Sequence, residues 1–250
     1  MPFIRPVLIA CGLMAVGSAF AEEAQIAVAS NFTAPMKAII QVFEEDTDHK
    51  MKVSYGSTGK LYAQINNGAP FEALLAADQE RPALLEEEGV GVPGSGFTYA
   101  IGNLVLWSAD ADKVEDGPAL LKSGDFNKLS LANPKLAPYG EASIETLEAL
   151  GLKTTIEPKF VMGENIAQTY QFIDTGNADI GFVALSQVME GGEIVKGSGW
   201  IVPAEMHTPI RQDALILNSG KDNTAVTELF TYLKGEKAQA IIHDFGYETE

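Results

Sequence analysis

Cysteine, histidine and basic residues are scarce in this chain. Its one cysteine is Cys11, near the amino terminus. A disulfide within one chain needs two cysteines, so the fold must be held by its hydrophobic core alone, which a chain of 250 residues can do. There are 17 Lys and Arg against 34 Asp and Glu, for a formal net charge of −17. This acidic balance argues against nucleic acid or an anionic membrane as a partner.

The small number of histidines restricts the catalytic options. A serine nucleophile needs a base and a group to orient that base, and the chain offers only His49, His207 and His243. The stretch "YGSTG" around Ser57 does not match the G-x-S-x-G turn of serine hydrolases. No spacing of His, Cys and Asp matches a metal-ligand pattern. We therefore expect no enzyme, no cofactor and no metal cation, and a secreted serine hydrolase using Ser57 is our third interpretation.

The chain also lacks a hydrophobic run of membrane-spanning length. Its apolar stretch Val7 to Val16 is too short for a span, and Ala19 and Ala21 form a small-residue cleavage site after it. This pattern predicts a secretory signal peptide over residues 1–21. Leu8 to Cys11, "LIAC", is the alternative, because it matches the cleavage site of a lipoprotein. Cleavage there would leave only a very short apolar core, which argues against it.

Strand-like and helix-like stretches alternate along the remaining sequence. Gln25 to Ser30 is a short β-like run, and the spacing of Met36, Ile39 and Phe43 after it predicts an amphipathic helix. This strand, loop and helix unit recurs, giving about nine strands and nine helices. Such alternation indicates parallel sheets with helices on both faces. The number of elements exceeds what one small sheet needs, so we predict two α/β lobes.

Four loops that lead from a strand into a helix carry small or amide residues at the start of the helix. They are Ser30-Asn31, Ser57-Thr58, Tyr139-Gly140 and Asn165-Ile166. Helix amino termini have free N–H groups and a partial positive charge, so several of them together can bind an oxyanion without Lys or Arg. Ordinary helix capping also explains each loop taken singly.

The motif "GSTGK" raises a nucleotide-binding alternative. A phosphate-binding P-loop needs glycine where Ser54 stands, and Ser or Thr after Lys60, where this chain has Leu61. No G-x-G-x-x-G motif follows a strand either. We therefore favour an uncharged anion site, to which Lys60 contributes little.

Five stretches resemble the periplasmic molybdate-binding proteins of molybdate ABC importers. They are "AVASNFTAPMKAI", "YGSTGKLYAQINNGAPFEALLAAD", "NPKLAPYGEAS", "GNADIGFVALS" and "LKGEKAQAIIHDFGY". The resemblance implies a two-lobed periplasmic-binding-protein fold of type II, in which each lobe is a mostly parallel sheet flanked by helices. We expect residues 22–103 with 208–250 to form one lobe and 104–207 the other, with the ligand in the cleft between them.

The same resemblance implies a function and a site. The protein would be a periplasmic monomer that captures molybdate or tungstate and delivers it to an inner-membrane ABC permease and its ATPase. The donors to the oxyanion would be the hydroxyls of Ser30 and Ser57 and the backbone N–H groups of Tyr139 and Ile166. Many members also have a tyrosine donor where this chain has Ala184, and Asn31 is our candidate to replace it. Another tetrahedral oxyanion, such as sulfate, is the alternative ligand.

We predict that Glu22 is the first residue of the exported chain, because Ala19 and Ala21 fill the small pockets of the signal peptidase. The intact mass of protein recovered from the exported fraction measures this directly. A diacylglyceryl adduct on Cys11 would instead establish the lipoprotein alternative.

Overall fold

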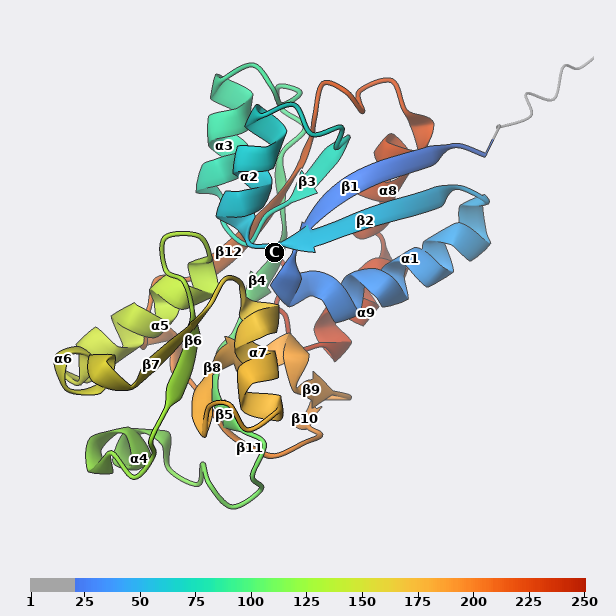
Figure 1. Ribbon diagram of the computed structural model, residues 1–250. Coiled ribbons are helices and arrows are strands. Elements are labelled where there is room, and N and C mark those ends of the chain that lie inside the picture. Colours follow the sequence, from blue (N-terminus) through green and yellow to red (C-terminus); the bar gives the residue numbers. More distant parts are fainter. Residues whose placement is uncertain (1–20) are drawn as a thin grey trace, which may run out of the picture.

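Two five-stranded sheets, each with helices packed beside it, form the framework of the protein (Figure 1). The structure is a computed structural model and describes residues 21–250. Except for Ala21, the predicted leader lies outside the described residues, as does Cys11 of the lipoprotein alternative. Within residues 21–250, no helix combines the length and the apolar character needed to cross a membrane.

The first sheet has the strand order β2-β1-β3-β12-β4. Its strands are β1 (Glu23–Ala29), β2 (Lys50–Gly56), β3 (Ala73–Leu75), β4 (Phe97–Gly102) and β12 (Ile210–Ile216). Strand β1 pairs in parallel with β2 and β3, whereas β12 runs antiparallel to β3 and β4. The helices beside this sheet are α1 (Thr33–Thr47), α2 (Thr58–Asn66), α3 (Glu80–Glu87), α8 (Thr224–Leu233) and α9 (Glu236–Asp244).

Alternating residues of β1 distribute these helices over the two faces of the first sheet. Ile26 and Val28 belong to the core shared with α1, α8 and α9, whereas Ala27 belongs to the core shared with α2 and α3. This division follows from the period of two that sends successive side chains of a strand to opposite faces. The apolar side chains predicted along α1, among them Met36 and Phe43, are fully buried against the sheet.

The second sheet has the strand order β11-β5-β8-β6-β7. Its strands are β5 (Leu104–Ser108), β6 (Leu129–Ala132), β7 (Phe160–Gly163), β8 (Ile180–Ala184) and β11 (Ser198–Ile201). Strand β6 is parallel to β7 and β8, while β5 is antiparallel to β8 and β11. Its helices are α4 (Gly117–Ser123), α5 (Pro138–Ala149), α6 (Lys153–Ile156) and α7 (Ile166–Asp174).

Short elements complete the described chain. They are the hairpin β9 (Met189–Glu190) and β10 (Glu193–Ile194) and the 3₁₀ turns η1 (Ser30–Phe32), η2 (Glu157–Lys159), η3 (Leu185–Gln187) and η4 (Ala204–Met206).

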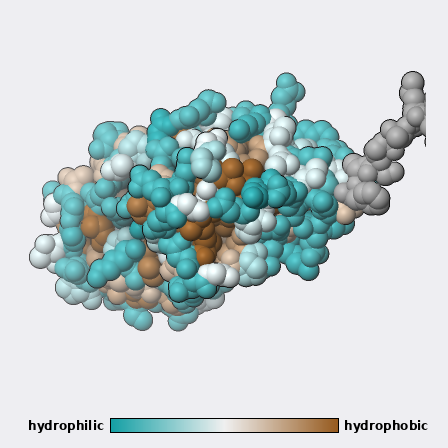
Figure 2. All heavy atoms as spheres, turned by 90° about the horizontal axis from the view of Figure 1, so that it is seen from above, coloured by the Kyte–Doolittle hydropathy of each residue, from teal (hydrophilic) through white to brown (hydrophobic). Residues whose placement is uncertain are grey.

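The face in Figure 2 is mainly hydrophilic, with hydrophobic atoms gathered in hollows near its middle. Most large apolar side chains of residues 21–250 are therefore inside the two sheets' cores, and Met162, Val195 and Ile201 are the large ones that are exposed.

The chain passes between the sheets twice. Strand β4 ends at Gly102, and only Asn103 separates it from β5 in the other sheet. The return, from β11 to β12, runs through residues 202–209. The end of the chain lies beside the first crossing, in the middle of the molecule (Figure 1): Ile101 and Glu248 exchange two backbone hydrogen bonds of 2.7 and 3.0 Å.

The two α/β units predicted from the sequence are present, but the pairing within each sheet is evenly mixed. All four antiparallel pairs of the two five-stranded sheets involve β5 or β12, the strands that the chain enters immediately after a crossing. A parallel pair needs a long crossover, usually a helix, and neither crossing contains an α-helix. No helix follows strand β4, so it does not repeat the strand, loop and helix unit from which the sheets were predicted.

Candidate functional site

A small pocket lies between the two sheets, where several parallel strands end. Its empty volume, including the mouth, is about 180 Å³. The described residues that line it lie at or just after the ends of β1, β2 and β3 in the first sheet, or at the starts of α5 and α7 beside the second. They are Ala29, Ser30, Asn31, Gly56, Ser57, Thr58, Ala77, Ala137, Pro138, Tyr139 and Ile166. All five residues that the sequence suggested as oxyanion donors line this one pocket. Ligands of α/β proteins commonly bind at the carboxyl ends of strands.

Helix starts from both sheets meet at the pocket. Ser57 is the N-cap of α2, Tyr139 is the second residue of α5, and Ile166 is the first residue of α7. The first N–H groups of a helix have no partner within the helix, and they carry its partial positive charge. The pocket therefore collects backbone donors from two separate sheets.

The side chain of Ser57 in the pocket has a buried hydroxyl without a partner. Its Oγ is the one buried side-chain nitrogen or oxygen among residues 21–250 that has no hydrogen-bond partner. The neighbouring Thr58 differs, because its Oγ1 accepts a hydrogen bond of 2.9 Å from the N–H of Ala77 and so fixes the loop after β3. Buried polar atoms are almost always paired, and leaving one unpaired costs about 1–3 kcal/mol. Ser57 Oγ is thus free to bind a ligand, whereas Thr58 is structural.

Tyr139 is held in place by close packing at the start of α5. A Cβ atom on Gly140 would lie 2.2 Å from the carbonyl oxygen of Ala132, at the end of β6. Only glycine allows this approach, so the helix start, and with it the backbone N–H of Tyr139, sits directly on the end of the strand.

Asn31 lines the pocket, but its side chain is occupied elsewhere. Its Nδ2 donates to Oε1 of Gln212 at 2.8 Å and to the hydroxyl of Tyr247 at 2.9 Å, which uses both amide hydrogens. A donor from Asn31 to the pocket can therefore only be its backbone N–H. The sequence alone could not reveal this, because Gln212 and Tyr247 lie far away along the chain.

Ala184, which stands in the position of the family's tyrosine, does not line the pocket. It is fully buried at the end of β8, where its N–H donates to Oε1 of Gln187 at 2.9 Å. Two residues further on, Ser186 Oγ lies 2.9 Å from both the carbonyl oxygen of Asn31 and the hydroxyl of Tyr247. A tyrosine hydroxyl is thus present beside this loop, but it comes from the carboxyl-terminal segment.

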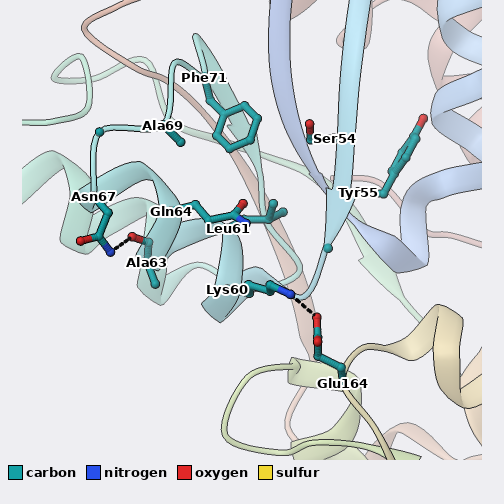
Figure 3. A pocket seen from close by; sticks show the side chains of 12 residues that line it. Ser54, Tyr55, Lys60, Leu61, Ala63, Gln64, Asn67, Ala69, Phe71 and Glu164 are labelled. Carbon is teal, nitrogen blue, oxygen red and sulfur yellow. Dashed lines mark hydrogen bonds and ion pairs between the residues drawn. The ribbon is translucent and has the colours of Figure 1, made fainter.

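The described residues that line the pocket include no charged side chain. Lys60 of the "GSTGK" motif lies outside the pocket, where its Nζ donates to Oε1 of Glu164 at 2.7 Å. Figure 3 shows this ion pair at the edge of a larger open pocket beside α2, with Glu164 coming from the loop before α7. Both side chains are 48% exposed. The structure therefore separates the lysine from the buried hydroxyl of Ser57.

None of the histidines is paired with Ser57. His49 contacts Glu22 and Glu228, His207 contacts Thr208, and His243 contacts Tyr247 and Thr249. Among residues 21–250, no group of three or more His, Cys, Asp or Glu side chains is placed to hold a metal ion. The site thus offers hydrogen-bond donors, and nothing in it supports the hydrolase interpretation.

Comparison with known proteins agrees with this geometry. Residues 24–248 match the family described as "Bacterial extracellular solute-binding protein". The chain is 55% identical over 241 residues to the molybdate-binding protein ModA of Azotobacter vinelandii, covering 96% of this chain and 95% of that one. It is 48% identical over 234 residues to ModA of Rhodobacter capsulatus, covering 93% and 90%.

A solved structure is similar to this chain as well. The periplasmic molybdate-binding protein of Azotobacter vinelandii superimposes with a TM-score of 0.87 and 37% sequence identity, over 91% of this chain and 99% of that one. The predicted two-lobed fold of type II is thereby confirmed. Solute-binding proteins are not enzymes, and the interpretation as a hydrolase is set aside. The chain belongs to the family of bacterial extracellular solute-binding proteins.

Proposed function

We propose that this protein captures molybdate in the periplasm and delivers it to an inner-membrane ABC permease and its ATPase. The observation that carries the proposal is the unpaired, buried hydroxyl of Ser57 in a pocket without charged side chains. The high identity to two ModA proteins supports molybdate as the ligand. The signal-like residues 1–21 support export, as does the periplasmic relative of known structure.

The proposed donors are neutral. They are the hydroxyls of Ser30 and Ser57 and the backbone N–H groups of Asn31, Tyr139 and Ile166. A hydrogen bond to a charged group contributes about 1.5–3 kcal/mol, so a few such donors can hold an anion without a lysine or arginine. Aligned N–H groups at helix starts are suited to this because they need no reorientation when the anion arrives.

The absence of a carboxylate among the described residues that line the pocket favours molybdate and tungstate. Both are fully ionised tetrahedral anions at neutral pH and can only accept hydrogen bonds. Monohydrogen phosphate carries a proton that needs an acceptor, and a serine hydroxyl that accepts it no longer donates to the anion. Sulfate has the same charge and acceptor pattern as molybdate, so only its smaller size can exclude it from donors fixed on both sides of the pocket.

We further propose that the protein is a monomer whose lobes are residues 22–103 with 208–250 (lobe 1) and residues 104–207 (lobe 2). The membership of the two sheets supports this division. Two contacts cross between the lobes beside the pocket: the N–H of Gly59 donates to the carbonyl oxygen of Leu136 at 2.9 Å, and Lys60 pairs with Glu164. Binding of the anion would favour this closed arrangement, with the chain bending at its two crossings.

Replacing Ser57 with alanine should weaken molybdate binding by about 1.5–3 kcal/mol, because a donor to a charged ligand is lost. Lys60→Ala should cost less than about 1 kcal/mol, since it removes only a half-exposed ion pair. That smaller loss should shrink further when salt is raised. Calorimetric titration of both variants at two salt concentrations measures these differences. Equal, salt-sensitive losses would show that the lysine binds the anion directly.

Molybdate and tungstate should bind in preference to sulfate and phosphate. The proton of phosphate either leaves a buried N–H unpaired, at a cost of about 1–3 kcal/mol, or makes a serine hydroxyl accept instead of donate, and sulfate forms longer hydrogen bonds. Competition titrations against bound molybdate test both cases. Displacement by sulfate at a comparable concentration would identify sulfate as an equal ligand and reject size selection.

Addition of molybdate should reduce the radius of gyration, because the ligand joins donors from both lobes. Small-angle X-ray scattering with and without molybdate measures this, with sulfate at the same ionic strength as the control. An unchanged radius at saturating molybdate would reject ligand-driven closure while leaving binding itself intact.

A further inference from the structure

A network of buried polar side chains lies directly behind the pocket. Four members belong to lobe 1: Asn31 in η1, Tyr99 in β4, Gln212 in β12 and Tyr247 in the carboxyl-terminal segment. The other two belong to lobe 2: Tyr139 in α5 and Ser186 in η3. Each is less than 6% exposed. Two of them, Asn31 and Tyr139, are also pocket residues whose backbone N–H groups are proposed donors. The network therefore connects the anion site with the strands on which the chain crosses between lobes.

Gln212 lies at the centre of this network. Its Oε1 accepts hydrogen bonds from Asn31 Nδ2 at 2.8 Å and from the hydroxyl of Tyr99 at 3.1 Å, both in lobe 1. Its Nε2 donates to the hydroxyl of Tyr139 at 3.2 Å, in lobe 2. One amide group thus contacts a pocket residue of each lobe, and Gln212 is completely buried.

The backbone around Gln212 departs from regular strand pairing. The pairing of β12 with β4 shifts register between Gln212 and Asp213, which indicates a β-bulge. Bulges redirect a side chain and occur preferentially beside functional sites. On the neighbouring strand β4, Gly102 pairs with Ile210, and a Cβ atom on Gly102 would lie 2.0 Å from the Tyr139 hydroxyl and 2.6 Å from Gln212 Nε2. Gly102, at the first crossing, therefore leaves the space in which the amide and the phenol meet.

The phenol groups of this network stay protonated. Burial raises the pKa of Tyr99 and of Tyr139 well above the ordinary value for tyrosine, and it raises the pKa of Tyr247 as well. Each hydroxyl can therefore both donate and accept at neutral pH. The Tyr247 hydroxyl uses this to contact the carbonyl oxygen of Asn31 at 3.0 Å and Ser186 Oγ at 2.9 Å, which gives a second link between the lobes.

We propose that Gln212 is a positioning residue for oxyanion binding, which couples the donor of Asn31 in lobe 1 to the donor of Tyr139 in lobe 2 when the lobes close. The inference rests on the proposed function. Opening the lobes separates Gln212 from Tyr139 but leaves its bonds to Asn31 and Tyr99 intact, because these lie within lobe 1. The bond to Tyr139 therefore favours the closed form and raises the affinity for the anion.

A matched pair of variants tests this coupling. Tyr139→Phe removes the phenol that bonds Gln212 across the lobes and keeps the backbone N–H of residue 139. Tyr99→Phe removes an equally buried phenol whose contacts, with the same amide at 3.1 Å and with the carbonyl oxygen of Ala76 at 2.9 Å, both lie within lobe 1. Tyr139→Phe should raise the Kd for molybdate about tenfold, which corresponds to about 1.4 kcal/mol. The change should come mainly from faster dissociation, because a buried amide hydrogen is left unpaired only in the closed form.

Tyr99→Phe is the control, and its Kd should stay within about twofold of the wild type, because its cost is the same in the open and closed forms. Thermal unfolding of both variants without ligand reports any general loss of stability, and stopped-flow dissociation of molybdate reports the coupling. A similar rise in Kd for the two variants, or no rise in either, would overturn the role of Gln212. Failure of the wild type to bind molybdate would instead refute the proposed function.

Discussion

An anion site built from neutral donors depends on those donors being held rigidly before the anion arrives. A charged ligand loses its hydration on entering the pocket, and only hydrogen bonds of good length can compensate for this loss. Most of the donors proposed for this protein are backbone N–H groups at helix starts or the hydroxyl of Ser57 at a helix N-cap, so the helices themselves fix their directions. The packing of Gly140 on the end of β6 and the bond from Ala77 to Thr58 keep these helix starts in place.

The overall charge of the protein does not assist this site. With a formal net charge of −17, the protein's long-range field repels an anion. Selection of an oxyanion must then take place at hydrogen-bond distance, where the partial charges of the helix starts act. The ion pair of Lys60 with Glu164 fits this arrangement, because the charge of Lys60, three residues after Ser57, is neutralised by a carboxylate of the opposite lobe. It contributes to contact between the lobes rather than to attraction of the ligand.

The two crossings of the chain give a physical reason for the proposed link between binding and closure. Both β4 and β12 adjoin a crossing, they pair with each other, and the carboxyl-terminal segment is bonded to Ile101 beside them. The side chains of Tyr99 and Gln212 project from these strands into the network behind the pocket. A change in the angle between the lobes would therefore alter the contacts of Asn31 and Tyr139, two of the proposed donors to the anion.

The sequence by itself determined the α/β class, the two lobes and the loops that form the pocket. It did so because strand and helix periods, helix-start residues and the spacing in "GSTGK" are local properties of the chain. The four loops could be named in advance, since each leads into a helix, and the resemblance to molybdate-binding proteins singled out Ser30, Ser57, Tyr139 and Ile166 within them. Asn31 could be named too, although the role of its side chain could not.

Only the tertiary structure decided which polar groups are free and which are occupied. Ser57 and Thr58 are adjacent residues with similar hydroxyl groups. The hydroxyl of Ser57 is unpaired, whereas that of Thr58 accepts a hydrogen bond from the N–H of Ala77, after β3. Gln212 and Tyr247 carry no local signal, because their partners lie 181 and 216 residues away at Asn31. Hydrogen bonds between distant segments depend on how the chain crosses between the lobes, and no period or motif in the sequence records that geometry.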